Sequence, residues 1–251
     1  MLTPAQRDRL EVVLVSPRNP LNIGAVARAM ANFGFSHLTV AAPYAPHWRE
    51  AKSAVGAPHL LTAAREFPTL AEALADCTFV AGTGTLTHRK PEQPVVPLPA
   101  FAPLLETELA RDNGRIALVF GPEKHGLTRD HLAFCHVLVE IPTDPRQPSM
   151  NLGQAVAVCL YELARPAPVP ALDSEPQQAP HPAATSAQLD RLADLVEQTM
   201  AAARYSPRSM QQANRHHLRL LLHRLALSPS DLRRVLGLFR RILWRIGGKT
   251  L

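Results

Sequence analysis

The chain has 251 residues, of which 46% are hydrophobic, and a formal net charge of +6. This length and composition allow one well-packed domain and a smaller appendage. The polar N-terminus lacks the apolar core of a secretory signal, and no uncharged apolar run approaches the roughly 20 residues that span a bilayer. We therefore expect a cytoplasmic protein that does not cross a membrane.

The first 165 residues alternate strand-like runs rich in Val, Ile and Leu with helical runs. This alternation is typical of an α/β fold with a mainly parallel sheet and helices on both faces. The expected strands are Glu11 to Ser16, His37 to Ala41, Thr78 to Gly82, Arg115 to Phe120 and His136 to Ile141. The expected helices are about Asn22 to Phe33, Leu70 to Ala75, Ala100 to Arg111, Thr128 to Phe134 and Leu152 to Ala164.

The composition changes after residue 165. Residues 166–186 are rich in Pro, Ala, Gln and Ser, which favours an extended spacer. Residues 187–251 have Leu and Val at helical spacing, and Ser228-Pro229-Ser230-Asp231 is a helix-start signal. We expect a main domain in residues 1–165, a linker in 166–186 and a small helical hairpin or bundle in 187–251.

The C-terminal part is strongly basic. Residues 204–251 contain eleven Lys and Arg against one Asp, whereas residues 1–203 contain 16 Lys and Arg against 20 Asp and Glu. Arginine pairs with phosphate through two hydrogen bonds, and the field of many like charges attracts polyanions. We expect this extension to bind an anionic partner; a solvated helical face is the alternative.

The three cysteines, Cys77, Cys135 and Cys159, lie in apolar segments and form no Cys-x-x-Cys pair. Their odd number and spacing argue against a disulfide framework or a zinc site. We expect them to be reduced residues of the core, and we expect no metal centre.

The sequence lacks the common nucleotide-binding signatures. Gly82-Thr83-Gly84 begins like a dinucleotide loop but has no third glycine and follows the third expected strand, not the first. The first turn holds only Gly24, and the second strand ends without an acid for a ribose hydroxyl. These features argue against a nicotinamide enzyme and against a methyltransferase of the ordinary Rossmann kind.

Three strand-to-helix turns carry unusual polar residues, and in a parallel sheet such turns meet at one edge. In the first, we expect Asn22 to cap the helix, and Arg28 is spaced so that its guanidinium can point back toward the turn; an ordinary surface arginine is the alternative. In the second, Glu123 stands among glycines that let the backbone approach a ligand; a solvent-facing turn residue is the alternative for Glu123. In the third, Ser149 and Asn151 precede a helix, which either could simply cap.

Together the three turns, Asn22-x-Gly24-x-x-x-Arg28, Phe120-Gly121-Pro122-Glu123-x-x-Gly126-Leu127 and Ile141 to Asn151, resemble the signature motifs of the TrmH-type SPOUT methyltransferases in order and spacing. With the basic helical extension, the chain most resembles the TrmJ-like tRNA 2′-O-methyltransferases. The resemblance implies a SPOUT-type parallel sheet with helices on both faces and a C-terminal trefoil knot, followed by a small α-helical extension.

The resemblance further implies a homodimer with its active site near the dimer interface. It implies that S-adenosyl-L-methionine is the cofactor and that the 2′-hydroxyl of nucleotide 32 in the tRNA anticodon loop, in cytidine or uridine, is the substrate. The motif residues that it assigns to catalysis are Asn22, Arg28, Glu123, Ser149 and Asn151. The residues that it assigns to cofactor binding are Thr83, Gly84, Thr85, Gly121, Ile141, Pro148, Ser149, Met150 and Asn151.

Methyl transfer from a sulfonium to a hydroxyl requires that the protein align the two groups and help the alcohol lose its proton. We expect Arg28 to hold a phosphate beside the target ribose, and Ser149 and Asn151 to orient the reactants. A guanidinium stays protonated to about pH 12 or above, so a phosphate or water is an alternative to Arg28 as the base. The alternative functions are methylation of another tRNA or rRNA nucleotide and RNA binding without catalysis.

Overall fold

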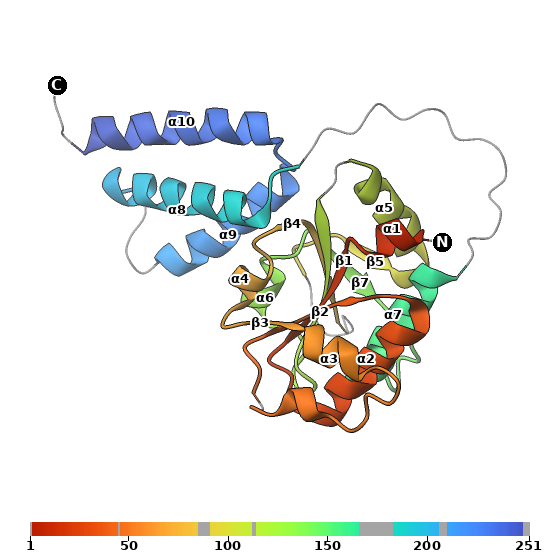
Figure 1. Cartoon of the computed structure of the whole chain (residues 1–251). Coiled ribbons are helices and arrows are strands. Elements are labelled where there is room, and N and C mark those ends of the chain that lie inside the picture. Colours follow the sequence, from red (N-terminus) through yellow and green to blue (C-terminus); the bar gives the residue numbers. More distant parts are fainter. Residues whose placement is uncertain are drawn as a thin grey trace, which may run out of the picture.

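The computed structural model describes residues 2–44, 46–84, 91–111, 114–165, 183–205 and 210–247. Its main body contains one parallel sheet (Figure 1). The strands are β1 (Leu10–Val15), β2 (His37–Ala41), β3 (Arg65–Phe67), β4 (Cys77–Thr83), β5 (Val95–Pro97), β6 (Arg115–Phe120) and β7 (Val137–Glu140). They pair in the order β3-β2-β1-β6-β4-β7-β5.

Helices cover both faces of this sheet because the side chains of its strands alternate between two apolar cores. In β1, Val12 and Leu14 belong to one core, and Val13 and Val15 belong to the other. The first core includes residues of α2 (Pro20–Phe33), α3 (Pro58–Ala63), α5 (Leu98–Arg111) and α7 (Leu152–Ala164), and the second includes residues of α4 (Leu70–Ala73) and of the segment that contains α6 (Arg129–Leu132). Two short helices, α1 (Pro4–Arg7) and η1 (Trp48–Glu50), complete the body.

The strands expected from the sequence are all present, and α7 has its expected bounds. The sequence does not predict β3 and β5, because each has three residues and lies at an edge of the sheet, where no alternating pattern can develop. It also does not predict the short helices α1 and α3. The parallel α/β fold is thus confirmed, and the trefoil knot remains a prediction.

The cysteines occupy the positions expected of core residues. Cys77, Cys135 and Cys159 are buried and free. Burial raises the pKa of each thiol to about 12. The thiols therefore remain protonated near neutral pH and behave as small apolar side chains.

The C-terminal part forms three helices, α8 (Ser186–Ala202), α9 (Gln211–Arg224) and α10 (Pro229–Ile246), around an apolar core of their own. The start of α10 is as predicted, since the Ser228 side chain accepts a hydrogen bond from the Asp231 amide and Pro229 lies in the first turn. Residues 166–182 of the expected linker lie outside the described ranges. The division into domain, linker and extension therefore stays a prediction, although α8 begins one residue before its expected boundary.

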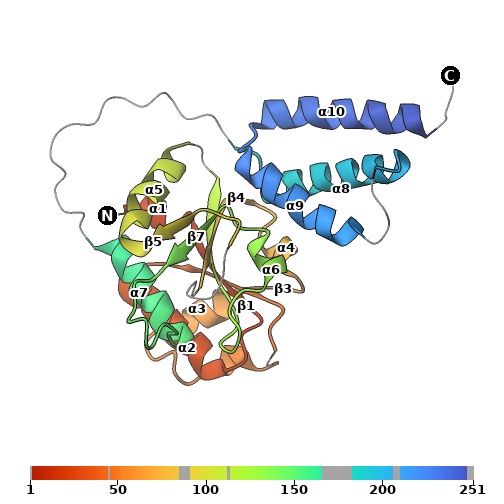
Figure 2. The same cartoon turned by 180° about the vertical axis from the view of Figure 1, so that it is seen from behind.

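The extension docks on the face of the body that carries α4 and α6 (Figure 2). The Ser186 hydroxyl donates to the Cys77 carbonyl at 2.9 Å, at the start of β4. From α9, the Arg219 guanidinium lies 4.5 Å from the ring centre of Phe134. Side-chain contacts therefore attach the extension to the body, in addition to the covalent connection of the chain.

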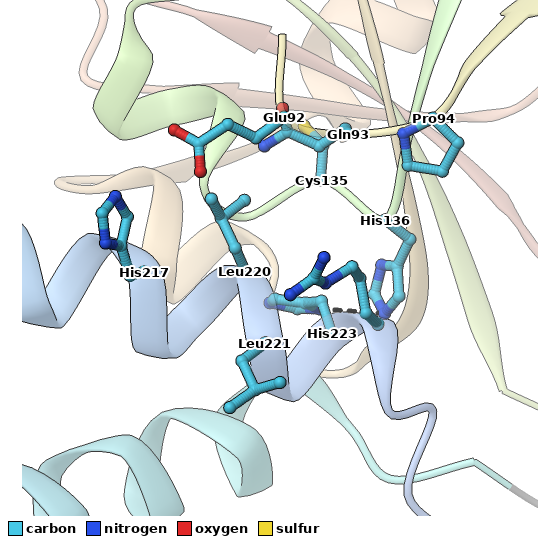
Figure 3. A pocket seen from close by; sticks show the side chains of 10 residues that line it. Glu92, Gln93, Pro94, Cys135, His136, His217, Leu220, Leu221 and His223 are labelled. Carbon is cyan, nitrogen blue, oxygen red and sulfur yellow. Dashed lines mark hydrogen bonds between the residues drawn. The ribbon is translucent and has the colours of Figure 1, made fainter.

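A buried histidine pair completes this docking, beside a cavity of about 360 Å³ between α9 and the body (Figure 3). His136 Nδ1 accepts a hydrogen bond from the Val80 amide at 3.0 Å. In a neutral ring, Nε2 then carries the proton and donates to His223 Nδ1, at 2.9 Å. Burial, then the nearby His223, lowers the pKa of His136 well below its ordinary value, and burial, then Arg219, lowers the pKa of His223 to about 4.

Within the described ranges, no group of three His, Cys, Asp or Glu side chains is placed to hold a metal ion. The helices of the same ranges include none with the length and apolar character needed to cross a membrane.

Acidification should loosen the extension from the body. Histidine gains a proton below about pH 6.5 in the unfolded chain, whereas both buried rings stay neutral in the folded protein. Their contribution to the free energy of unfolding is therefore complete above that pH, and it declines as the pH falls toward the pKa values of the folded state. For His223 that lower limit is a pH of about 4. Urea unfolding at a series of pH values measures the effect as a falling midpoint.

The matched variants for this measurement are His223→Gln and His217→Gln, because His217 lies on the same helix but is exposed. His223→Gln should flatten the pH dependence between these limits, and His217→Gln should leave it as in the wild type. Parallel pH profiles for the two variants would show that the buried pair does not control docking.

Candidate functional site

The carboxyl ends of β4, β6 and β7 open into a cavity of about 470 Å³. This volume is within the range of small-molecule and cofactor sites. Three separate loops contribute its walls, and both apolar and charged side chains line it. The lining residues are Thr83, Gly84, Phe120, Gly121, Pro122, Glu123, Lys124, His125, Gly126, Glu140, Ile141, Thr143, Pro148, Ser149, Met150, Leu152 and Ala155.

Glu123 joins two of the three signature turns at this edge of the sheet. Its carboxylate accepts hydrogen bonds from the backbone amides of Arg18 and Asn19, each at 3.1 Å, and from the Asn22 side chain at 2.9 Å. The two amides lie at the N-terminal end of α2, where a negative charge is favourable. Glu123 therefore holds the β1–α2 turn against the β6–α6 loop.

The same contacts determine the charge of Glu123. Partial burial raises the pKa of Glu123, but the hydrogen bonds from the Asn22 side chain and from backbone amides, including those of Arg18 and Asn19, outweigh it and lower the pKa below the usual value. The side chain is thus a carboxylate at neutral pH with three donors on its oxygens. This makes Glu123 an anchor and a poor proton acceptor.

Asn22 does not cap α2, which corrects the expectation from the sequence. The helix begins at Pro20, and the side chain of Asn19 is its cap. The prediction placed the helix start two residues late because Asn19-Pro20 is itself a cap followed by a first-turn proline. Asn22 lies in the first turn, from which its side chain reaches Glu123.

Asn151 joins the third signature turn to the first. Its side-chain oxygen accepts from the amides of Gly153 and Gln154, which makes it the cap of α7. Its side-chain amide donates to the Asn22 side-chain oxygen at 2.9 Å. The capping role and the role in a shared site are therefore compatible, and Asn22, Glu123 and Asn151 form one network.

The glycines of the motifs are explained by packing. A Cβ on Gly24 would lie 2.2 Å from the Ser53 hydroxyl, and a Cβ on Gly153 would lie 2.8 Å from the Ala25 Cβ. Gly153 thus permits the close contact of α7 with α2. A Cβ on Gly121 would lie 2.2 Å from backbone atoms of Gly126 and Leu127, so only glycine fits this turn.

The residues assigned to cofactor binding gather around the cavity. Thr83 is fixed by a hydrogen bond from its hydroxyl to the Val119 carbonyl at 3.0 Å. Ser149 is exposed at the cavity wall. Thr85 lies outside the described residues, and Asn151 reaches the site through Asn22 without lining the cavity. The other members of the set, Gly84, Gly121, Ile141, Pro148 and Met150, line the cavity.

Arg28 is the predicted residue that the structure does not bring into this network. Its side chain is exposed on α2 and is absent from the cavity lining. Among the described residues, none forms a hydrogen bond or ion pair with it. The placement of the Arg28 guanidinium toward its own turn therefore stays a prediction.

Sequence reasoning missed several polar residues of the cavity, among them Lys124, Glu140 and Thr143. Glu140 is the last residue of β7, and its position at a carboxyl end of the parallel sheet was a signal that could have identified it. The Thr143 hydroxyl donates to the Pro148 carbonyl at 3.3 Å, across the proline-rich loop, and no local pattern predicts that contact.

The three signature turns also relate the chain to known proteins. A family model described as "SpoU rRNA Methylase family" matches residues 9–161, which is more than half of the chain. The chain belongs to this SpoU methylase family. The match covers all three signature turns and ends within α7.

Relatives extend the comparison beyond the SpoU domain. A tRNA (cytidine/uridine/adenosine-2'-O-)-methyltransferase TrmJ from Pseudomonas aeruginosa is 44% identical over 62% of this chain, which spans 60% of that protein. A tRNA (cytidine/uridine-2'-O-)-methyltransferase TrmJ from Klebsiella pneumoniae is 32% identical over 96% of this chain and 99% of its own length. The crystal structure of TrmJ from Z. mobilis ZM4 has a TM-score of 0.80 at 30% identity, covering 92% of this chain and 98% of that chain.

The packing around Gly121 and Gly84 predicts that alanine destabilises the protein at the first position and not at the second. Gly121→Ala should lower the free energy of unfolding by about 1–3 kcal/mol, because its Cβ would overlap backbone. Gly84→Ala is the matched control, since no atom lies within 4 Å of its added Cβ. Urea unfolding of both variants tests this, and equal stability of the two would contradict the packing explanation.

Proposed function

We propose that this protein transfers the methyl group of S-adenosyl-L-methionine to a ribose 2′-hydroxyl of tRNA, at nucleotide 32 of the anticodon loop. The observation that carries the proposal is the convergence of Asn22, Glu123 and Asn151 from three distant turns beside one cavity. The 2′-O-methyltransferase names of the relatives support the substrate class.

The cavity fits the cofactor that SpoU methyltransferases bind. Its volume of about 470 Å³ suits a nucleoside-sized ligand, and Gly84, where an added Cβ would meet no atom within 4 Å, leaves the backbone open at its wall. Ile141 and Met150 supply apolar surface. These residues would hold the cofactor, which when bound supplies an electrophilic methyl group.

The protein's own residues position the acceptor and deal with its proton. The Asn22–Glu123–Asn151 network fixes the turn that carries α2, and Ser149 offers an exposed hydroxyl beside it to orient the ribose. Glu123 is a weak base because three donors occupy its oxygens and its pKa is lowered. The alcohol's proton therefore leaves to a substrate phosphate or to water, and Arg28 holds that phosphate.

A homodimer, with its active site near the interface, is part of the proposal. α2 and α7 pack side by side (Figure 1) and carry the exposed apolar side chains Leu21 (57% exposed) and Tyr161 (54%). Exposed apolar groups on adjacent helices suit a contact with a second copy. Arg28, exposed on α2, would then lie close to that contact.

Substitution of Arg28 tests the function and the phosphate contact together. The wild type should methylate tRNA transcripts at ribose 32 with S-adenosyl-L-methionine, and Arg28→Ala should lower the methylation rate by about 10²-fold or more. Arg28→Lys should weaken tRNA binding less than Arg28→Ala, because it keeps the charge. Site mapping of ribose methylation and a separate binding titration measure the two effects.

Two outcomes would contradict this assignment. Absence of methylation by the wild type, with cofactor and tRNA both bound, would favour a non-catalytic RNA-binding protein. Wild-type rates and affinities in Arg28→Ala would remove Arg28 from the mechanism.

The extension should bind phosphates through α10. Arg233, Arg240 and Arg245 are exposed on this helix, and none of them forms an ion pair within the described part of the chain. Removing one arginine that neutralises a phosphate reduces the slope of log K against log salt by about 0.7–0.9. The triple alanine variant should therefore bind tRNA with a shallower slope than the wild type. Arg111→Ala, at the far end of α5, is the control, and identical slopes for all three proteins would exclude α10 from tRNA binding.

A further inference from the structure

The adjacent strands β1 and β2 are each followed by the same three-residue backbone conformation. Ser16 and Ala42 follow directly on the registered pair Val15–Ala41, and both have a positive φ, of 45° and 48°. Each is followed by a proline and then by an exposed side chain, Arg18 in one strand and Tyr44 in the other. A non-glycine residue in the left-handed region is strained, and the strain is kept only where the surrounding structure enforces it.

Backbone hydrogen bonds hold both three-residue segments in place. The Ser16 amide donates to the Ala41 carbonyl, and the Ala42 amide donates to the Phe67 carbonyl, each at 2.8 Å. The Tyr44 amide donates to the Pro17 carbonyl at 3.3 Å, which ties one loop to the other. The paired ends of β1 and β2 therefore present two side chains together.

These two side chains stack on each other in the open. The Arg18 guanidinium carbon lies 4.8 Å from the centre of the Tyr44 ring. Tyr44 is 69% exposed, and Arg18 is exposed as well. Among the residues that the structure describes, no carboxylate pairs with the Arg18 guanidinium. A fixed aromatic ring with an uncompensated cation is a surface that suits unpaired nucleobases and their phosphates.

The stack adjoins the candidate active site. Glu123 lines the cavity and also accepts the hydrogen bond of the Arg18 amide. In the sheet, β1 lies next to β6 and β2 lies next to β1, and the carboxyl end of β6 forms a wall of the cavity. Two strand spacings correspond to about 10 Å, so a nucleotide next to the target ribose could reach the ring.

We propose that Tyr44 and Arg18 form a stacking platform for an unpaired base of the RNA substrate that flanks the methylated ribose. The inference rests on the proposed function, because it assigns a second contact for the same RNA. Tyr44 supplies the face for the base, and Arg18 supports the ring and contributes a positive charge toward the backbone. Unpaired bases of a loop are available for such stacking, whereas bases of a duplex are not.

Substitutions of Tyr44 test the stacking. Tyr44→Ala and Tyr44→Leu should raise the dissociation constant for tRNA by about 5- to 150-fold, and Tyr44→Phe should bind within about twofold of the wild type. Cofactor affinity should be unchanged in all three. The Leu variant keeps apolar bulk without an aromatic face, so its loss of affinity cannot be explained by a missing side chain alone.

The salt dependence separates the two residues. Tyr44→Ala should keep the slope of log K against log salt, because it removes no charge, whereas Arg18→Ala should make the slope shallower by about 0.7–0.9. Arg111→Ala removes a charge at the end of α5, just before β6 begins and thus away from the carboxyl ends of the strands, and it should leave tRNA affinity unchanged. Thermal unfolding of each variant checks that the fold is retained.

The platform is overturned if Tyr44→Ala and Tyr44→Leu bind tRNA as tightly as the wild type. A lowered thermal midpoint with unchanged tRNA affinity in the folded variants would also overturn it and would assign Tyr44 a structural role. These binding measurements need no turnover, so failure of methylation by the wild type would count against the proposed function and leave the platform to its own test.

Discussion

The candidate site depends on one carboxylate that joins separate parts of the chain. Glu123 is about a hundred residues from each of its three partners, Arg18, Asn19 and Asn22. Each hydrogen bond to a charged group contributes about 1.5–3 kcal/mol when shielded and less at an exposed site such as this. Their value lies in geometry, because three bonds to one side chain fix both the position and the direction of the β1–α2 turn. Asn151 then brings the start of α7 into the same arrangement.

Close backbone packing supports this network. Gly121 lets the β6–α6 loop fold tightly on itself, and Gly153 lets α7 approach α2. Gly24 leaves room for the loop that contains Ser53, and the Ser53 hydroxyl donates a hydrogen bond to the Leu21 carbonyl at 2.7 Å. The signature glycines therefore serve the fold of the site more directly than its chemistry. The strained residues at the ends of β1 and β2 lie at the same edge, where the positions of side chains matter more than local stability.

The basic extension is held by a different kind of contact. It is attached to the body by the hydrogen bond from the Ser186 hydroxyl to a backbone carbonyl and by the Arg219 guanidinium over the Phe134 ring. The hydrogen bond between the buried, neutral rings of His136 and His223 is the third contact. The neutral histidine pair avoids burying a charge at the junction. Exposed arginines of α10 remain available to solvent, so the docking and the proposed binding of RNA use separate parts of the extension.

The sequence by itself determined the parallel α/β class, the position of α7 and the start of α10, because strand composition and caps are local properties. It could not determine that Asn19 caps α2 while Asn22 turns to Glu123, because both are asparagines at a helix start and only a partner from the loop after β6 distinguishes them. The exposed position of Arg28, the edge strands β3 and β5, the His136–His223 pair and the Arg18–Tyr44 stack were likewise decided by tertiary structure. Each depends on a contact between segments far apart in the chain or on a strand too short to show a pattern, and neither leaves a periodic signal in the sequence.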